Sequence, residues 1–520
     1  MKQKLLLIIF LFPLFSKAQY QRQFGSSTGN DVTGRMVRTS DGGYVIAGDT
    51  YSFGLTKSDV LVTKLNAAGN VQWSKSYGSS DYDHGYDIIQ TTDGGYAICG
   101  VSGSNSNRAS LIKMNASGVI QWSRYFSVNT RQSFSSLVQT ADGGFAMAGQ
   151  ASTNNNGSWG YVVKTDSTGA LQWSKLIFPR DFYPEIRDLI VTKDGGFALV
   201  GIYPNPAYYD MYFIKLSSTG TFEWARSVGG SSSDYPTFLI QASDEGYVFG
   251  GMSFSYQTPL NQDVFAVKMD KDGNRLWSRT IGTVTKSESA IDIQELPDKG
   301  YVILGVSDSS ATNAAVSPFI MRLNKNGSLM STKVVTVSDN VSVKSITPVN
   351  ANGFAVCGTA GSLLNNTQDM YFLKFDKNGN TCGSFIKLDY TKDTGTLVTL
   401  TIPVTNANTI AAGGADISID RALTTTTICQ SVTATTVNNS KAESIHIFPN
   451  PAKDFIHITV PDAADKILSA AIIDINGNTV MNIKTVQLNQ INVSMLKPGI
   501  YTLVAHTAAK EYRAVFMKEL

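Results

Sequence analysis

The stretch TTDGGYAICG, residues 91–100, places an Asp-Gly pair between two apolar runs. This arrangement is a strong local signal for a tight turn between antiparallel β-strands. Closely related stretches end at six other glycines, namely Gly48, Gly149, Gly201, Gly251, Gly305 and Gly358. Seven copies of one predicted β-hairpin indicate a repeat protein.

The spacing of the turns predicts the architecture. The Asp position of the turn falls at residues 41, 93, 142, 194, 244, 298 and 351, so successive copies lie 49 to 54 residues apart. One period contains four strand-like segments, VQWSKSYG, YDIIQT, YAICG and ASLIKMN. Four-stranded antiparallel blades arranged around an axis form a β-propeller. We therefore predict an all-β chain whose residues 19–387 form a seven-bladed propeller of four-stranded blades.

A second signature marks the other turn of each repeat. A short turn ending in Gly precedes Trp73, Trp122, Trp173, Trp224 and Trp277, whereas the last two copies lack the Trp. We expect the Gly to supply a positive φ and the Trp to be buried between neighbouring blades. The pattern resembles the tryptophan docking motif of quinoprotein propellers. It differs by one residue between the Asn or Asp and the Gly, which argues against quinone chemistry.

A basic residue precedes each of these turns, at Lys64, Lys113, Lys164, Lys215, Lys268, Arg322 and Lys374. Because the end of the third strand lies beside the start of the second, each cation is predicted to contact the turn Asp of its own blade. The alternative is a ring of seven cations that binds an anion.

The closure of the propeller is also predicted, because residues 20–27 match residues 73–80. The N-terminal strand should complete the final blade, with the matching last strand near residues 380–387.

Residues 20–387 resemble the DGGY-repeat propellers of secreted bacterial surface proteins, a resemblance that implies a fold and no single activity.

Residues 444–520 contain short alternating strands and turn signals, which predict a small immunoglobulin-like β-sandwich. They also resemble the type A C-terminal sorting domain of the type IX (Por) secretion system. The matching positions are Pro449, Asn450, Pro451, Asp474, Gly477, Leu496, Gly499 and Tyr501. The resemblance implies that the type IX machinery is a partner and that the protein crosses the outer membrane of a Gram-negative bacterium.

The first eighteen residues have the features of an export signal. A basic start, MKQK, precedes the apolar run LLLIIFLFPLF and the small residues of SKA. The apolar run is shorter than the ~20 residues of a spanning helix, and no other segment reaches that length. We therefore expect a protein that is secreted or held at the outer-membrane surface. Residues 388–443 are predicted to add strands beside the ring and then a Thr-rich linker.

Composition excludes some classes of partner. The formal net charge is +2 with 16% charged residues and no basic block, so a nucleic-acid partner is not expected. Cys99 and Cys357 occupy equivalent strand positions and are predicted core residues. Cys382 and Cys429 are candidates for a disulfide, which export would permit.

Few residues suit catalysis. The propeller contains a single histidine, His84, and the chain has no GxSxG, HExxH or phosphate-loop motif. The loops opposite the Asp-Gly turns vary in length and are rich in Ser, Asn, Asp and Tyr, which suits ligand binding above a rigid scaffold. The predicted ligand-binding residues are Asp81, Asp83, His84, Asp181, Tyr183, Tyr208, Tyr209, Asp234, Tyr235 and Tyr256. Ca²⁺ could bind Asp81, Asp83 and His84, and no other cofactor is predicted. The alternative is that these loops are only soluble connections.

Three functions fit these observations. The leading hypothesis is a non-catalytic propeller that binds a polysaccharide or a surface protein. The second is a polysaccharide-degrading hydrolase or lyase. It would require two or three convergent carboxylates, or His84 with a Tyr and a basic residue, on the variable-loop face. The third is a structural repeat protein of the cell surface.

Overall fold

The computed structural model describes residues 19–519 apart from 27–28, 53–56, 104–107, 129–130, 153–157, 178–184, 205–206, 257–260, 284–285, 309–315, 336–340, 350–352, 362–367, 377–384, 387–389, 393–395, 401–403, 407–409, 414–416, 421–423, 432–445, 449–451, 460–467, 475–478, 484–489 and 507–510. The predicted signal peptide and Cys382 lie outside the described residues. All regular elements of the described part are β-strands, as the composition predicts. The chain divides into two compact units, residues 1–433 and 434–520.

The first unit contains seven antiparallel sheets of five strands each, and four strands of every sheet form a blade. Blade 1 consists of β2 (Asp31–Arg38), β3 (Tyr44–Thr50), β4 (Asp59–Leu65) and β5 (Val71–Gly78). Blade 2 consists of β6 (Asp83–Gln90), β7 (Tyr96–Ser102), β8 (Arg108–Met114) and β9 (Ile120–Ser127). Blade 3 consists of β10 (Arg131–Gln139), β11 (Phe145–Ser152), β12 (Ser158–Thr165) and β13 (Leu171–Ile177).

Blade 4 consists of β14 (Glu185–Val191), β15 (Phe197–Pro204), β16 (Tyr209–Leu216) and β17 (Phe222–Gly229). Blade 5 consists of β18 (Asp234–Gln241), β19 (Tyr247–Ser253), β20 (Asp263–Met269) and β21 (Arg275–Gly282). Blade 6 consists of β22 (Glu288–Glu295), β23 (Tyr301–Asp308), β24 (Val316–Leu323) and β25 (Leu329–Val335). Blade 7 consists of β26 (Val341–Pro348), β27 (Gly353–Gly361), β28 (Gln368–Asp376) and β1 (Gln19–Gly25).

The N-terminal strand closes the ring, as the sequence match predicts. Strand β1 pairs with β28 in the register Phe24↔Met370 and forms the fourth strand of blade 7. The strands that line the axis are β2, β6, β10, β14, β18, β22 and β26, because each contacts its counterparts in the two adjacent blades. The strand that precedes the Asp-Gly turn is therefore the innermost strand of every blade.

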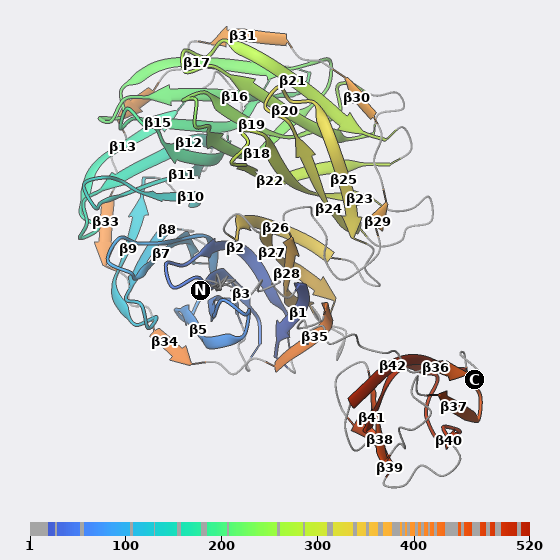
Figure 1. Cartoon of the computed structure of the whole chain (residues 1–520). Coiled ribbons are helices and arrows are strands. Elements are labelled where there is room, and N and C mark those ends of the chain that lie inside the picture. The colour runs from blue at the N-terminus through green and yellow to red at the C-terminus, as the bar shows by residue number, and fades with distance from the viewer. Residues whose placement is uncertain are drawn as a thin grey trace, which may run out of the picture. The chain divides into compact units, whose positions relative to one another are not determined.

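A belt of short strands surrounds the seven blades and runs opposite to the order in which the blades follow one another. It comprises β29 (Phe385–Ile386), β30 (Tyr390–Lys392), β31 (Thr396–Leu400), β32 (Val404–Asn406), β33 (Ile410–Gly413), β34 (Ile417–Asp420) and β35 (Thr424–Ser431). These strands pair with the outer strands of blades 6, 5, 4, 3, 2, 1 and 7 in that order (Figure 1, orange arrows). Each blade thus gains a fifth strand that covers its open edge. The predicted extra strands beside the ring are present, and β29 adds to blade 6 rather than completing blade 7.

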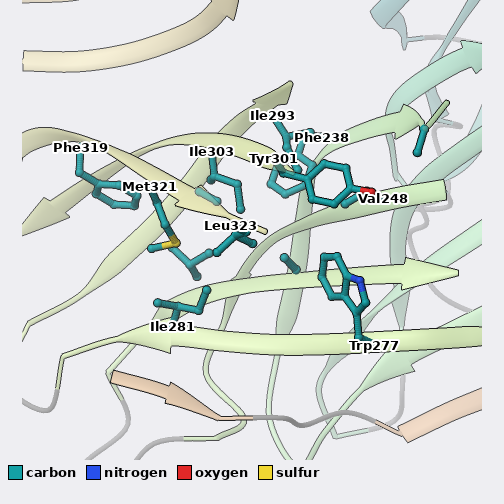
Figure 2. Close-up of a cluster of buried hydrophobic side chains, with 14 of the residues drawn as sticks. Phe238, Val248, Trp277, Ile281, Ile293, Tyr301, Ile303, Phe319, Met321 and Leu323 are labelled. Atoms are coloured by element: carbon teal, nitrogen blue, oxygen red, sulfur yellow. The ribbon is translucent and has the colours of Figure 1, made fainter. Parts of the chain in front are cut away.

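The Trp residues pack between neighbouring blades, as predicted. A Cβ added at Gly118 of blade 2 would meet the Trp73 ring of blade 1 at 2.9 Å, and Gly169, Gly220, Gly273 and Gly327 stand in the same relation to the four later Trp residues. Trp277 joins the apolar core between blades 5 and 6 together with Tyr301 and Phe319 (Figure 2).

We expect Gly118→Ala to destabilise the propeller by about 2–3 kcal/mol, because the methyl group would clash with Trp73 and because Gly118 has a φ of +73°. Gly94→Ala is the matched control, since Gly94 has a φ of +80° but nothing within 4 Å of an added Cβ. The control should cost only about 1 kcal/mol. Urea unfolding midpoints measure both values. Equal losses in the two variants would contradict the proposed Trp–Gly packing.

The predicted Asp–cation contacts are also present in blades 1 to 6. The Lys64 amine lies 2.8 Å from Asp41, and five further pairs lie 2.5–2.9 Å apart. In blade 7 the sequence has Ala351 at the Asp position, and Lys374 donates a hydrogen bond to the carbonyl of Ala67 at 3.4 Å. Because six of the seven cations are paired with a carboxylate, the alternative of a ring that binds an anion is excluded.

An arginine occupies the axis of the ring. Arg35 of the innermost strand β2 lies 3.7 Å from Asp87 on β6, 3.8 Å from Asp188 on β14 and 3.9 Å from Asp292 on β22. These aspartates belong to blades 2, 4 and 6, so one guanidinium from blade 1 joins three blades that are not consecutive. Burial raises the pKa of Asp87 to about 6, although the charge of Arg35 opposes this shift.

Each axial aspartate also connects its blade to the next one. Asp87 accepts a hydrogen bond from the backbone N–H of Leu137 in blade 3 at 2.8 Å. Asp188 and Asp292 accept the equivalent bonds from Leu239 in blade 5 and Ile346 in blade 7, each at 2.9 Å. Blades 2 and 3, 4 and 5, and 6 and 7 are thereby joined in pairs.

The second unit contains two antiparallel sheets that share one apolar core. One sheet is formed by β36 (His446–Phe448), β37 (Phe455–Thr459) and β40 (Gln490–Asn492). The other is formed by β38 (Ser469–Asp474), β39 (Thr479–Ile483), β41 (Gly499–His506) and β42 (Glu511–Lys518). This arrangement is the predicted β-sandwich.

Four of the motif positions in the second unit can be located. Asp474 and Tyr501 are register partners, Gly499 begins β41, and Leu496 packs on the core. The Tyr501 hydroxyl donates a hydrogen bond to the Lys497 carbonyl at 2.8 Å. The other four positions, Pro449, Asn450, Pro451 and Gly477, lie outside the described residues.

Candidate functional site

The two ends of the blades differ in character. The Asp-Gly turns and the turns before the Trp residues lie at one end of the strands, which we call the turn face. The loops that lead into the innermost strands lie at the other end, which we call the variable face. Among the described propeller residues, the exposed aromatic side chains are Tyr51, Tyr82, Tyr86 and Tyr209, each 38–42% exposed. All four lie in loops or strand segments of the variable face.

Three of these tyrosines belong to blades 1 and 2, next to the junction of the two blades that contains His84. The imidazole of His84 and the phenol ring of Tyr86 are parallel within 2°, with ring centroids 6.2 Å apart. Tyr51 directly follows β3, and Tyr82 lies in the loop before β6 under the Lys57 amine, which is 5.4 Å from its ring centroid. Lys57 also forms an ion pair of 2.8 Å with Asp81. We call these residues the tyrosine site.

Both ring nitrogens of His84 face protein groups. Its Nδ1 lies 2.9 Å from the Asp49 carboxylate, and its Nε2 lies 3.4 Å from the Ser58 hydroxyl. The hydrogen bond to Asp49 raises the pKa of His84. Asp, His and Ser in this order resemble a hydrolase triad, but Ser58 is completely buried. A buried hydroxyl cannot attack a polymer, so this geometry suits a fixed imidazole better than a nucleophilic site.

A second group of predicted residues lies where blades 4 and 5 meet. The rings of Tyr209 and Tyr235 are 5.9 Å apart, and Phe254 packs edge-on against Tyr235 at 6.4 Å. Asp234 is buried beneath them and accepts hydrogen bonds from the Gly230 N–H at 2.9 Å and the Ser255 hydroxyl at 2.8 Å. Burial raises the pKa of Asp234 to about 6.

The remaining predicted residues have individual positions. Asp83 is buried and accepts hydrogen bonds from the N–H and hydroxyl of Ser79. Tyr208 is half-buried, and Tyr256 packs against Phe265. Asp181 and Tyr183 lie outside the described residues. In the described part of the chain, no group of three or more His, Cys, Asp or Glu side chains is arranged to hold a metal ion.

Sequence reasoning identified His84 and Asp81 but missed the neighbours that complete the tyrosine site. Tyr51 and Asp49 belong to blade 1, and their proximity to His84 depends on which strand lines the axis. Tyr82 and Tyr86 do have a signal, because the stretch DYDHGYD of residues 81–87 places them on either side of His84.

The stability of the propeller is expected to decrease as the pH rises from 5 to 8. Asp87 and Asp234 have a pKa of about 6 in the folded protein and about 4 in the unfolded chain. Between these values the folded state binds more protons than the unfolded state. The resulting stabilisation is therefore lost as the pH approaches and passes 6. His84 also has a raised pKa, and its contribution is lost as the pH rises further. The exposed aspartates with a pKa of about 2 affect stability only in acid, namely Asp41, Asp93, Asp142 and Asp194.

Melting temperatures between pH 5 and pH 8 test this expectation. Asp234→Asn should flatten the slope by removing a contribution on the order of 2 kcal/mol. A melting temperature that rises with pH over this range would contradict the assignment.

Comparison with known proteins identifies the second unit. Residues 446–519 match the secretion system C-terminal sorting domain. The protein is therefore delivered through the type IX secretion system to the outer-membrane surface or the medium, and its sorting domain is the part that engages that machinery. None of the described residues forms a helix long and apolar enough to cross a membrane.

Solved structures with similar architecture are distant in sequence. The extracellular domain of a hybrid two-component system from B. thetaiotaomicron is 11% identical with a TM-score of 0.40, and the alignment covers 95% of this chain and 57% of that one. A protein from Dyadobacter fermentans is 10% identical with a TM-score of 0.40, covering 69% and 99% of the two chains. The polysaccharide lyase Uly1 is 7% identical with a TM-score of 0.43, covering 68% and 99%. No curated protein sequence matches the chain.

Proposed function

We propose that the propeller is a non-catalytic binding module that recognises a glycan or a surface protein through its variable face. The observation that carries this proposal is the location of the exposed aromatic side chains, since all four in the described propeller lie on that face. Tyrosine rings pack against the C–H faces of sugars and against peptide side chains, and their hydroxyl groups remain available for hydrogen bonds.

The tyrosine site has the composition of a glycan-binding surface. Tyr51, Tyr82 and Tyr86 supply apolar rings, and the Lys57–Asp81 pair supplies a donor and an acceptor beside them. The pair is about one-third exposed on each side, so a ligand can reach it. Secretion by the type IX route places this surface where extracellular polysaccharides and surface proteins are found.

A polysaccharide-degrading enzyme is the second candidate, and one observation favours it. The rings of His84 and Tyr86 are stacked, and Lys57 directly precedes Ser58, whose hydroxyl faces His84. A His, a Tyr and a Lys acting together could transfer protons during cleavage of a sugar chain. The contacts of the two His84 nitrogens with Asp49 and Ser58 favour the binding role, because both nitrogens already face protein groups. Asp81, Asp83 and His84 contact Lys57, Ser79 and Asp49 respectively rather than converging on one point. The Ca²⁺ dependence predicted from the sequence is tested by chelation.

The double variant Tyr51→Ala/Tyr86→Ala is expected to weaken binding to the preferred polysaccharide at least about ten-fold, because each ring buries sugar surface worth roughly 1 kcal/mol. Met330→Ala is the matched control, since Met330 is 63% exposed at the turn face. Sedimentation with insoluble polysaccharides, with and without EGTA, measures the bound fraction. Equal binding by the wild type and the double variant would refute the tyrosine site.

A further inference from the structure

A cavity of about 660 Å³ opens on the turn face between blades 5 and 6. Its walls come from the Asp-x-Gly turns of both blades, from β20 and β21 of blade 5, and from the turn between β24 and β25 of blade 6. It lies at the opposite end of the strands from the tyrosine site, so its role is separate from the function proposed above.

The cavity occurs where the repeat loses a polar side chain. In blades 1 to 3 the amine of the turn lysine donates a hydrogen bond to a glutamine eight residues later, as Lys64 does to Gln72 at 3.1 Å, and in blade 4 it pairs with Glu223. The equivalent residue in blade 5 is Leu276, which is 56% exposed and lines the cavity. Lys268 instead donates to the Tyr301 hydroxyl at 2.8 Å. Leu276 cannot accept a hydrogen bond from Lys268, and it adds an exposed apolar side chain to the lining of the cavity.

The backbone is strained at the same place. Glu245 and Lys299 have φ values of 69° and 66° at the turn position where blades 1 to 4 have glycine. A side chain in this left-handed region costs free energy that glycine avoids, and such strain is commonly found at ligand sites. Lys299 lines the cavity, and its amine donates to the Ser243 hydroxyl at 2.8 Å. Ser243 in turn donates to the carboxylate of Glu295 at 2.8 Å.

The charges of the lining suggest the chemistry of a ligand. Four cationic side chains and two carboxylates line the cavity. Within the described part of the chain, Lys299 and Lys325 take part in no ion pair, so both can meet an anionic group. Glu295 can accept hydrogen bonds from hydroxyl groups, and Leu276 can pack against an apolar face. A ligand that satisfies all of these groups carries an anion and several hydroxyls on a compact ring.

We propose that this cavity binds an acidic saccharide, in which Lys299 and Lys325 bind the carboxylate or sulfate and Glu295 accepts sugar hydroxyl groups. An acidic peptide offers the anion but lacks the hydroxyl donors. The apolar face of the sugar ring would pack against Leu276, at the position where blades 1 to 3 have a glutamine.

Calorimetric titration of the full chain with trigalacturonate, and separately with a sulfated galactose disaccharide, tests this proposal. Saturable binding of either one is expected, and the better ligand identifies the anion. Lys299→Gly and Leu276→Gln should each weaken binding at least about ten-fold, because the first removes a cation and the second restores the glutamine of the other blades. Lys299→Gly should also raise the melting temperature, because it relieves the strained φ.

Glu245→Gly is the matched control. It relieves the same strain in the neighbouring turn, but Glu245 does not line the cavity, so the melting temperature should rise with unchanged affinity. The proposal is overturned if neither saccharide binds, if both cavity variants bind as the wild type does, or if triglutamate binds as tightly as the saccharides. Tyr51→Ala/Tyr86→Ala should leave this binding unchanged, which separates it from the variable face.

Discussion

Replacement of Arg35 by methionine is expected to destabilise the propeller by about 3–5 kcal/mol at neutral pH. The guanidinium is the shared counter-ion of Asp87, Asp188 and Asp292, whose side chains are only 4–6% exposed. Methionine leaves three buried carboxylates without a cation, and removal of one partner of a buried ion pair typically costs this much. Chemical denaturation at pH 7.5 measures the loss.

The pH dependence of the Arg35→Met variant distinguishes lost charge from lost packing. Burial raises the pKa of Asp87 and Asp188, and Arg35 lowers it. Without the cation these two buried carboxylates bind protons more readily in the folded state, so the variant should regain much of its stability as the pH falls to about 5. Arg187→Met is the matched control on the innermost strand β14, because Arg187 is 44% exposed and forms an ion pair with Glu185 of its own strand. The control should lose less than about 1 kcal/mol. An Arg35→Met variant as stable as the wild type at pH 7.5 would contradict the axial role.

Removal of the belt is expected to have the second large effect. A chain that ends at residue 433 keeps all seven belt strands, whereas a chain that ends at residue 384 lacks them. The shorter chain loses the pairing of β35 with β1 and the outer partner of every blade, which we expect to cost at least about 5 kcal/mol. Its seven open edges should also promote aggregation.

Thermal unfolding and light scattering of the two truncated chains test this prediction. The chain ending at residue 433 should unfold cooperatively near the temperature of the intact propeller, and the chain ending at residue 384 should melt much lower or aggregate. Because neither chain has the sorting domain, the difference reports the belt alone. Equal melting temperatures would show that the belt strands do not contribute to the stability of the seven blades.

The blades could be predicted from sequence because their signals repeat. The turn recurs seven times, with Asp in six copies and Ala at residue 351, and a Lys or Arg recurs before the second turn of each blade, so the hairpins could be located. The match of residues 20–27 with residues 73–80 predicted the closure of the ring. The belt was harder to predict in detail, because most of its strands are only two to five residues long and such segments are too short to show a hydrophobic period.

The functional residues were only partly predictable. Asp87, Asp188 and Asp292 do carry a signal, because each is a charged residue within an apolar strand of alternate blades. Their common partner, Arg35, could not be found without knowing that these strands line the axis. For the same reason His84 could be identified as unusual, but Asp49 and Tyr51 of the neighbouring blade could not be placed beside it.

The most direct test of the proposed function combines binding and cleavage in one measurement. The full chain is incubated with a panel of insoluble polysaccharides, and both the protein depleted from solution and the reducing ends released are quantified. We predict depletion by at least one polysaccharide without released ends, and loss of that depletion in Tyr51→Ala/Tyr86→Ala but not in Met330→Ala. Release of reducing ends that depends on His84 would contradict the binding role and identify the tyrosine site as catalytic.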